Sequence, residues 1–291
     1  IFDKIYGCLA GLALGDALGM PTEGLTPNEI QQIFGYVTTF KRAPDGHPNS
    51  FLPEGHITDD TEETIVLIDA IIENKGIITP ESFSEKLIDW AKKGLDKKPY
   101  VGPSTRKAIE NILNGVPIEL AGERNVTCGA AMRIAPIGLL YPGRPEVAAK
   151  KAAEISRVTH GGKPAIAAAS AVAAAISISL SEDASLDKII DAAINGARTI
   201  ERNFILVVAS PSISFRLSSI SLICLIYLEI AIALKAAYFT PFLVDCRIIF
   251  ITFIINFEGY SQTAPNFLSN NAASKDRPAV LIFFITFLNI S

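Results

Sequence analysis

Apolar residues recur every three to four positions through most of residues 1–203, which is the period of an α-helix with one buried face. Strand signals are scarce in this part of the chain. The expected fold is therefore all-α, a compact multi-helix bundle forming a single domain over residues 1–291. The helical period predicts helices over the opening residues through Asp16, from Thr58 to about Asn74, and over Pro80–Gly94, Gly102–Asn114, Pro145–Val158, 164–180 and Leu186–Ile200.

Two long segments interrupt the helical pattern, 20–57 and 115–135, and both are rich in glycine and proline. They are expected to be loops, and loops of this length in a compact domain are often functional.

The first predicted helix carries a stripe of small residues that would let another backbone approach closely. Lys4 followed by the apolar run Ile5–Leu14 resembles a secretory signal. However, the helical pattern continues through Asp16, and the apolar run is too short to cross a bilayer, so we expect a buried helix of a soluble core. The stripe consists of Gly7, Gly11, Gly15 and Gly19.

The composition changes from about Phe204 onward. Of the chain's 20 glycines, only Gly259 lies in this part. Glu229 and Lys235 interrupt the longest apolar run and the other runs are too short to span a membrane, so buried helices are expected in place of membrane spans. The apolar runs cover residues 218–240, 248–257 and 279–289.

Charge and cysteine content narrow the class of protein. The net charge is −4 and no run of lysine and arginine occurs, which argues against a nucleic-acid partner. The four cysteines show no CxxC spacing, so neither a zinc site nor a disulfide framework is expected. We therefore expect a protein of the reducing cytoplasm with no membrane partner.

The segment Ile57–Glu63 is the strongest candidate for chemistry, because four carboxylates and two hydroxyls open an apolar helix. Thr58 can cap that helix, but a helix dipole offsets only about half a charge. Thr58, Asp59 and Asp60 form an all-oxygen ligand set that suits Mg²⁺ or Mn²⁺. The alternative is an over-capped, solvated helix start.

Three further polar features lie in apolar sequence, and each has two interpretations. Asp16 ends the first helix and Glu23 follows in a loop, where each acid is either part of a site or a solvated cap. The small residues of Thr127–Arg133 either offer backbone N–H groups to a pyrophosphate or allow tight helix packing. His160 either contacts a ligand or interacts with a helix C-terminus.

The order of these segments resembles that of the ADP-ribosylglycohydrolase family, which includes dinitrogenase-reductase-activating glycohydrolases and crystallin J1 relatives. The resemblance covers about two-thirds of the chain. The motifs that carry it are GCLAGLALGDALG at 7–19 with Pro21 and Glu23, the Thr58–Thr61 motif TDDT, CGAAMR at 128–133 followed by Ala135 and Pro136, and the pair Thr159 and His160.

The resemblance implies an all-helical fold with two Mg²⁺ or Mn²⁺ ions that hydrolyses the bond joining ADP-ribose to a protein side chain or a small molecule. Paired metals can hold a ribose diol and activate a water, which a nearby carboxylate positions. The implied catalytic residues are Glu23, Asp59 and Asp60. The implied metal ligands are Thr58, Asp59, Asp60 and Thr263. The implied substrate-binding residues are Asp16, Glu23, Gly129, Ala130, Ala131, Met132 and His160.

The resemblance fails at the second metal segment of the family, Asn-x-Gly-Gly-Asp-Thr-Asp-Thr. The nearest match is 256–263, where Tyr260 and Gln262 stand at the two aspartate positions. A neutral phenol and a neutral amide do not replace two carboxylates around a hard cation. As written, the sequence therefore predicts loss of metal affinity and of hydrolysis.

Two explanations stay open at this point. Either the chain is a degenerate homologue, a non-catalytic ADP-ribose-binding or crystallin-like structural protein, or residues from about 204 onward do not represent the true protein. The sequence indicates neither the ADP-ribosyl linkage that is cleaved nor the oligomeric state.

Overall fold

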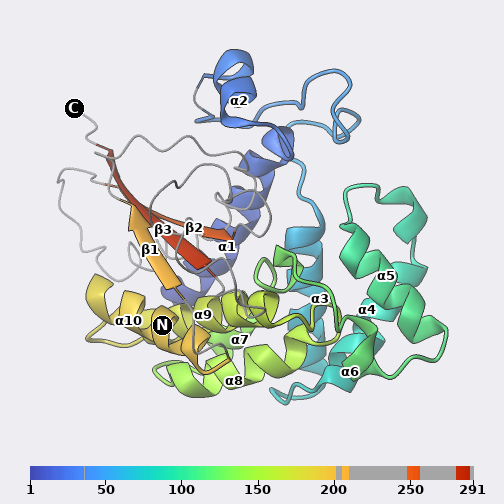
Figure 1. Ribbon diagram of the computed structural model, residues 1–291, viewed down its shortest axis with the longest axis vertical. Helices are drawn as coiled ribbons and strands as arrows, with labels where there is room; N and C mark the ends of the chain where they lie inside the picture. The colour runs from blue at the N-terminus through green and yellow to red at the C-terminus, as the bar shows by residue number, and fades with distance from the viewer. Residues whose placement is uncertain (36, 201–204, 210–247, 256–279, 289–291) are drawn as a thin grey trace, which may run out of the picture.

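The computed structural model describes residues 1–35, 37–200, 205–209, 248–255 and 280–288 (Figure 1). Up to residue 200 these residues form α-helices joined by loops and three short 3₁₀ helices. The α-helices are α1 (Phe2–Gly19), α2 (Pro27–Ile33), α3 (Asp59–Glu73), α4 (Pro80–Lys92), α5 (Pro103–Leu113), α6 (Ile118–Ala121), α7 (Ala135–Leu140), α8 (Pro145–Ser156), α9 (Lys163–Ser179) and α10 (Leu186–Arg198). The 3₁₀ helices are η1 (Met20–Thr22), η2 (Leu95–Lys97) and η3 (Cys128–Ala130).

The helices predicted within residues 1–200 are all present, and the all-α prediction is confirmed over that range. The structure adds α2 and α6 inside the two segments that were expected to be loops. α2 begins with a capping box in which Thr26 accepts from the Glu29 N–H and the Glu29 carboxylate accepts from the Thr26 N–H. Pro27 follows the cap at the first helical position. This local signal could have identified α2 from the sequence.

α9 is the centre of the helical core and packs against α7, α8 and α10. It is built largely from buried alanines, so neighbouring backbones approach it closely. A Cβ at Gly196 of α10 would lie 2.7 Å from the Ser170 carbonyl oxygen, and one at Gly138 of α7 would lie 2.8 Å from that of Ala173. Side chains at these two glycines would force the helices apart.

α1 contacts α3 and α7, and its four regularly spaced glycines are buried, as the small-residue stripe predicts. Lys4 near its start donates to the carbonyl oxygens of Ser179 and Ser181, at 3.1 and 3.0 Å. A lysine at these carbonyls satisfies groups that the end of α9 leaves unpaired. The charged start of the chain therefore anchors α1 to the end of α9.

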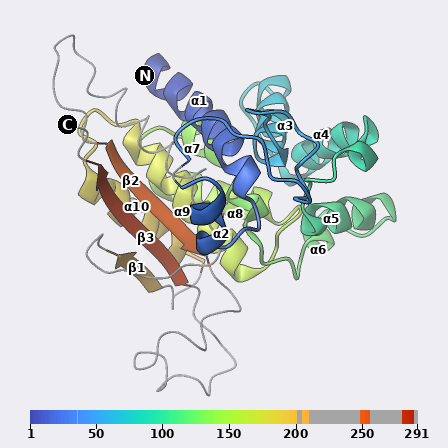
Figure 2. The same ribbon diagram turned by 90° about the horizontal axis from the view of Figure 1, so that it is seen from above.

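The last described residues form a three-stranded sheet of β1 (Ile205–Ala209), β2 (Ile248–Ile255) and β3 (Val280–Leu288) in the order β1-β3-β2. β1 pairs with β3 in parallel, and β2 pairs with β3 antiparallel, with Ile248 opposite Leu288. The sheet lies next to α10 in both views (Figures 1 and 2).

The helices predicted over 248–257 and 279–289 are therefore wrong, since the described parts of both segments are strands. Both runs consist mainly of isoleucine, phenylalanine, valine, leucine and threonine, and β-branched and aromatic residues favour strands. A short, continuous apolar run has no period that separates a buried strand from a buried helix. The third run, 218–240, lies outside the described residues, and the single domain over 1–291 stays a prediction.

Over the described residues, the structure contains no helix that is both long and apolar enough to cross a bilayer.

Candidate active site

Asp16, at the end of α1, holds the start of α3 in place. Its Oδ1 accepts from the Thr58 hydroxyl at 2.7 Å, and its Oδ2 accepts from the Thr58 N–H at 2.7 Å. The N–H and hydroxyl of Thr61 also donate to Oδ2, at 3.2 and 2.5 Å. Asp16 is only 2% exposed, and burial raises its pKa while the bonds from Thr61 and Thr58 oppose that rise.

This arrangement corrects one expectation about Thr58. The residue occupies the N-cap position of α3, but its side chain accepts no bond from the helix backbone. Its hydroxyl donates to Asp16 instead. A hydroxyl that donates its hydrogen keeps its lone pairs, so the Thr58 oxygen is still able to bind a cation.

Asp59 and Asp60 follow directly, and no lysine or arginine among the described residues pairs with either of them. Asp59 is 7% exposed and accepts the Gly102 N–H at 3.1 Å. Burial raises the pKa of both carboxyls well above the ordinary value, and the next contributions come from Glu63 at Asp59 and from Asp16 at Asp60. In the described part of the chain, neither aspartate forms an ion pair.

The other two acids of the segment are balanced by protein groups. Glu62 pairs with Lys98 at 2.6 Å, and Glu63 pairs with Arg133 at 2.5 Å. Of four neighbouring carboxylates, two are thus neutralised within the protein. The uncompensated charge of Asp59 and Asp60 is what a divalent cation would neutralise.

Side chains that would complete a metal site are not gathered around these aspartates in the described ranges. Among those residues, no group of three or more histidine, cysteine, aspartate or glutamate side chains could hold a metal ion. Thr263, the fourth predicted ligand, lies outside the described residues, as does the whole segment 256–263. The two-metal site therefore stays a prediction.

Glu23 follows η1 and is anchored through both its backbone and its side chain. The side chain accepts from Asn49 Nδ2 at 2.9 Å, and the backbone carbonyl oxygen lies 2.6 Å from His47 Nε2. Because a carbonyl only accepts, Nε2 carries the hydrogen, and His47 Nδ1 accepts the Asn49 N–H at 3.0 Å. Glu23 is near enough to Asp59 and Asp60 for its charge to add to the rise in their pKa, after burial and the closer acids. Sequence analysis did not identify His47 and Asn49.

The segment Thr127–Arg133, which we call the small-residue segment, lies near the two aspartates, whose charges raise the pKa of its Cys128. Its four predicted substrate-binding residues are all buried: Gly129, Ala130, Ala131 and Met132. Within it, the amides of Ala131 and Met132 donate to the Cys128 carbonyl oxygen, at 2.7 and 3.2 Å. This turn leaves the amides of Gly129 and Ala130 as candidates for an anion. Burial, with Asp60 and Asp59, raises the pKa of Cys128 to about 12, so this residue stays a thiol.

The His160 ring packs against Gly129 of the small-residue segment and bonds to its Thr127. Arg133 donates to the Thr159 oxygen, so the Thr159 hydroxyl gives its own hydrogen to His160 Nδ1 at 2.8 Å. Nε2 then carries the ring hydrogen and donates to the Thr127 hydroxyl oxygen at 2.9 Å. His160 is 1% exposed, and burial together with Arg133 lowers its pKa to about 3, so the ring stays neutral. Its ring bonds go to hydroxyls and not to a helix C-terminus; contact with substrate stays a prediction.

A buried ion pair connects α3 to the same segment. Both Glu63 and Arg133 have no exposed side-chain surface, and Arg133 also donates to the Gly129 carbonyl oxygen at 2.7 Å. The guanidinium lies 5.0 Å from the centre of the Phe83 ring. Arg133 therefore ties the helix that carries Asp59 to the backbone of the small-residue segment. Sequence analysis gave neither partner this role.

Substituting Gly129 by alanine should displace the small-residue segment. The new Cβ would lie 2.5 Å from Cε1 of His160, a ring that two threonine hydroxyls hold in place. Crowding of this kind costs about 1–3 kcal/mol of unfolding free energy. Urea denaturation of Gly129→Ala should show this loss.

A double variant tests the cause of that loss. Gly129→Ala combined with His160→Ala removes the clash, so the double variant should lose less stability than the two single variants added together. Strictly additive losses would contradict the proposed contact.

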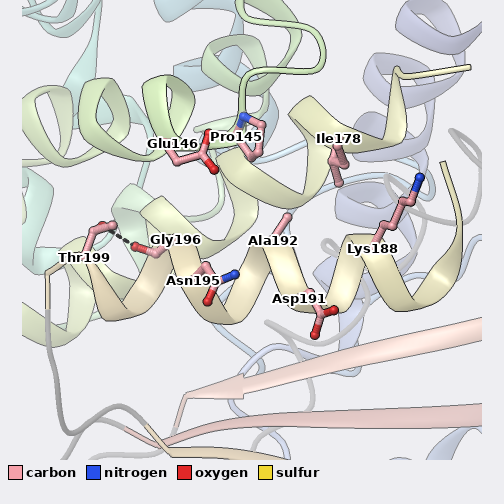
Figure 3. A pocket seen from close by; sticks show the side chains of 9 residues that line it. All are labelled: Pro145, Glu146, Ile178, Lys188, Asp191, Ala192, Asn195, Gly196 and Thr199. Carbon is pink, nitrogen blue, oxygen red and sulfur yellow. Dashed lines mark hydrogen bonds between the residues drawn. The ribbon is translucent and has the colours of Figure 1, made fainter. Parts of the chain in front are cut away.

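A recess of about 240 Å³ lies elsewhere, between the start of α8, the end of α9 and one face of α10 (Figure 3). Its polar lining includes Glu146, Asp191, Asn195 and Thr199, and the Thr199 hydroxyl donates to the Gly196 carbonyl oxygen at 2.6 Å. None of the predicted site residues borders it. The candidate chemistry therefore belongs to the acidic start of α3 and not to this recess.

Much of the chain is similar to known proteins. The family model described as ADP-ribosylglycohydrolase matches residues 1–237. An uncharacterised protein of Archaeoglobus fulgidus is 44% identical over 170 residues, which is 58% of this chain and 53% of that protein. The ADP-ribosyl-[dinitrogen reductase] glycohydrolase of Rhodospirillum rubrum is 31% identical over 161 residues, which is 55% of this chain and 52% of that protein.

A solved structure agrees with these matches. A chain of an ADP-ribosylglycohydrolase-related protein complex superposes with a TM-score of 0.50 and 29% identity, covering 61% of this chain and 56% of that one. The chain thus spans about half the length of the curated relatives described above.

Proposed function

Because the chain belongs to the ADP-ribosylglycohydrolase family, we propose that it is a metal-dependent hydrolase of the cytosol. It would cleave the glycosidic bond between ADP-ribose and a protein side chain or a small ADP-ribosyl compound. One observation carries the proposal: two adjacent aspartates, which no described lysine or arginine neutralises, open α3 at the position of the family's TDDT motif.

The residues at this position fit a divalent cation. Thr58, Asp59 and Asp60 would hold it through oxygen atoms, which hard cations prefer. Asp16 fixes the backbone and hydroxyl of Thr58, so the ligand set is ordered before the cation binds. When bound, the cation would lower the pKa of a water and polarise the ribose oxygens.

The remaining site residues would orient the attacking water and the substrate. Glu23, held by Asn49, presents a carboxylate that can position a water against the anomeric carbon. The amides of Gly129 and Ala130 would bind the negative diphosphate. Arg133 and His160 hold that segment in place from the protein interior.

The second candidate function is an ADP-ribose-binding protein without catalysis. One observation favours it: Tyr260 and Gln262 stand where the family has two aspartates, in a segment outside the described residues. Intact mass and peptide mapping across residues 204–291 should come first. Tail peptides that match the written sequence would remove the explanation that the sequence is faulty there.

The proposed activity is tested by release of ADP-ribose. The full chain would be incubated with ADP-ribosylated arginine and serine peptides and a small ADP-ribosyl ester, with Mg²⁺ or Mn²⁺. We expect release from at least one substrate and its complete loss after chelation. Binding of ADP-ribose without release at saturating metal would support the second candidate, and release that persists after chelation would refute the metal mechanism.

A further inference from the structure

Glu62 lies in the first turn of α3, and three donors from other parts of the chain converge on its carboxylate. Trp90 Nε1 and the Tyr100 hydroxyl each donate at 3.0 Å, and Lys98 Nζ lies 2.6 and 2.7 Å from the two oxygens. The Lys98 ammonium also lies 5.6 Å from the centre of the Trp90 ring and 5.8 Å from that of Tyr100. We call Glu62, Trp90, Lys98 and Tyr100 the Glu62 cluster.

The segment 95–102, which contributes Lys98 and Tyr100, is also fixed by Arg106 of α5. The Arg106 guanidinium donates to the carbonyl oxygens of Leu95 and Val101, both at 3.0 Å, and to that of Lys98. Apart from η2, this segment has no regular structure. Glu62 on one side and Arg106 on the other therefore hold this loop in place.

Two contacts connect the segment 95–102 with acids of the candidate site, one through Gly102 and one through Tyr100. At the end of the segment, the Gly102 N–H donates to Asp59 Oδ2 at 3.1 Å. Tyr100 packs against a small apolar cluster that includes the first residue of η1, the turn that leads into Glu23. This apolar cluster consists of Met20, Ala43 and Leu52.

We propose that the Glu62 cluster is a positioning device for both acids, acting on Asp59 through Gly102 and on Glu23 through the packing of Tyr100. In this proposal its members act only through these contacts with Gly102 and the apolar cluster, and not as ligands of the metal or the substrate. The part of the inference that concerns metal affinity rests on the proposed function. The part that concerns Gly102 does not.

The variant Lys98→Met distinguishes a role of the cluster in positioning the acids from a direct effect of the Lys98 charge on cation binding. Removing a cation near Asp59 and Asp60 makes the surroundings more negative, so electrostatics alone would tighten cation binding. Loss of positioning would weaken it instead. We expect Mn²⁺ binding, measured by electron paramagnetic resonance, to weaken about tenfold, the lower end for groups that orient metal ligands.

Two further readouts follow the same variant. Trp90 is the only tryptophan of the chain, so its emission reports directly on the cluster and should change in Lys98→Met. Exchange of the Gly102 amide with solvent, followed by nuclear magnetic resonance, should become roughly tenfold faster as the segment loosens. Tyr100→Phe keeps the packing and loses one bond, so its effects should be smaller, at about threefold.

Lys86→Met is the matched control, because Lys86 pairs with Glu73 at the far end of α3. It removes the same charge and should leave both Mn²⁺ affinity and Gly102 exchange unchanged. Equal or tighter Mn²⁺ binding by Lys98→Met would overturn the inference. If the unmodified chain bound no Mn²⁺, the proposed function would fail, and unchanged Gly102 exchange in Lys98→Met would still refute the positioning role.

Discussion

Replacing Asp59 and Asp60 together by alanine should abolish metal-dependent release of ADP-ribose, by a factor of about a thousand or more. The two carboxylates are the proposed anionic ligands, and a catalytic metal contributes several kcal/mol of transition-state stabilisation, at about 1.4 kcal/mol per tenfold in rate. Mn²⁺ binding should be lost as well. Both effects are measured on the full chain, by product release and by electron paramagnetic resonance.

The same variant should unfold at a higher temperature than the unmodified chain when no metal is present. Burial and neighbouring acids raise the pKa of both carboxyls, which means that their charged forms are unfavourable in the folded protein. Removing them relieves this repulsion. A higher melting temperature in the presence of chelator would separate loss of function from misfolding.

A charge-matched control is available on the solvent side of the same region. Asp69 of α3 and Asp89 of α4 are both exposed, so Asp69→Ala with Asp89→Ala removes two acids without touching the site. This control should keep full activity. Activity that survived in Asp59→Ala with Asp60→Ala would refute the metal mechanism.

Replacing Arg133 by methionine should destabilise the protein by about 3–5 kcal/mol, the range for removing one partner of a buried ion pair. Glu63 would be left without its cation in a site where neither side chain has exposed surface. The variant also loses the bonds from Arg133 to Gly129 and Thr159. Urea denaturation should show the loss, and ADP-ribose binding should weaken because the small-residue segment is no longer held.

A double variant distinguishes charge burial from packing. Glu63→Gln combined with Arg133→Met removes both charges, so it should recover a substantial part of the stability that Arg133→Met loses. Lys107→Met serves as the control, since Lys107 and Glu110 form an exposed pair whose loss should cost less than about 1 kcal/mol. Equal destabilisation by the exposed and buried changes would contradict this account.

The acidic segment shows how far the sequence predicts the site. Four carboxylates in seven residues indicated excess negative charge. The family resemblance implied that Asp59 and Asp60 are the metal ligands among them, and this stays a prediction. The sequence could not show that Lys98 and Arg133 neutralise the other two, because these cations lie 36 and 70 residues away along the chain. Partners at such separation are set by helix packing and not by local pattern.

The contacts that hold the site residues in place could not be predicted from the sequence for the same reason. Asn49 holds Glu23 from 26 residues away, and Asp16 holds Thr58 from 42 residues away. A capping role for the Thr58 hydroxyl was a sound local expectation, but a buried carboxylate from α1 competes for that hydroxyl.

Helical periodicity predicted α3 and α9 well, whereas the apolar runs at 248–255 and 280–288 had no period that could identify them as strands.

The alanines of α9 have a thermodynamic consequence. Fixing an alanine side chain costs no rotamer entropy, whereas each leucine or isoleucine costs about 0.5–1 kcal/mol. The most central helix is thus ordered at a low entropic cost, and that advantage grows with temperature. We expect α9 to keep its hydrogen bonds to higher temperatures than the exposed α2, so heating should melt this fold from its periphery inward.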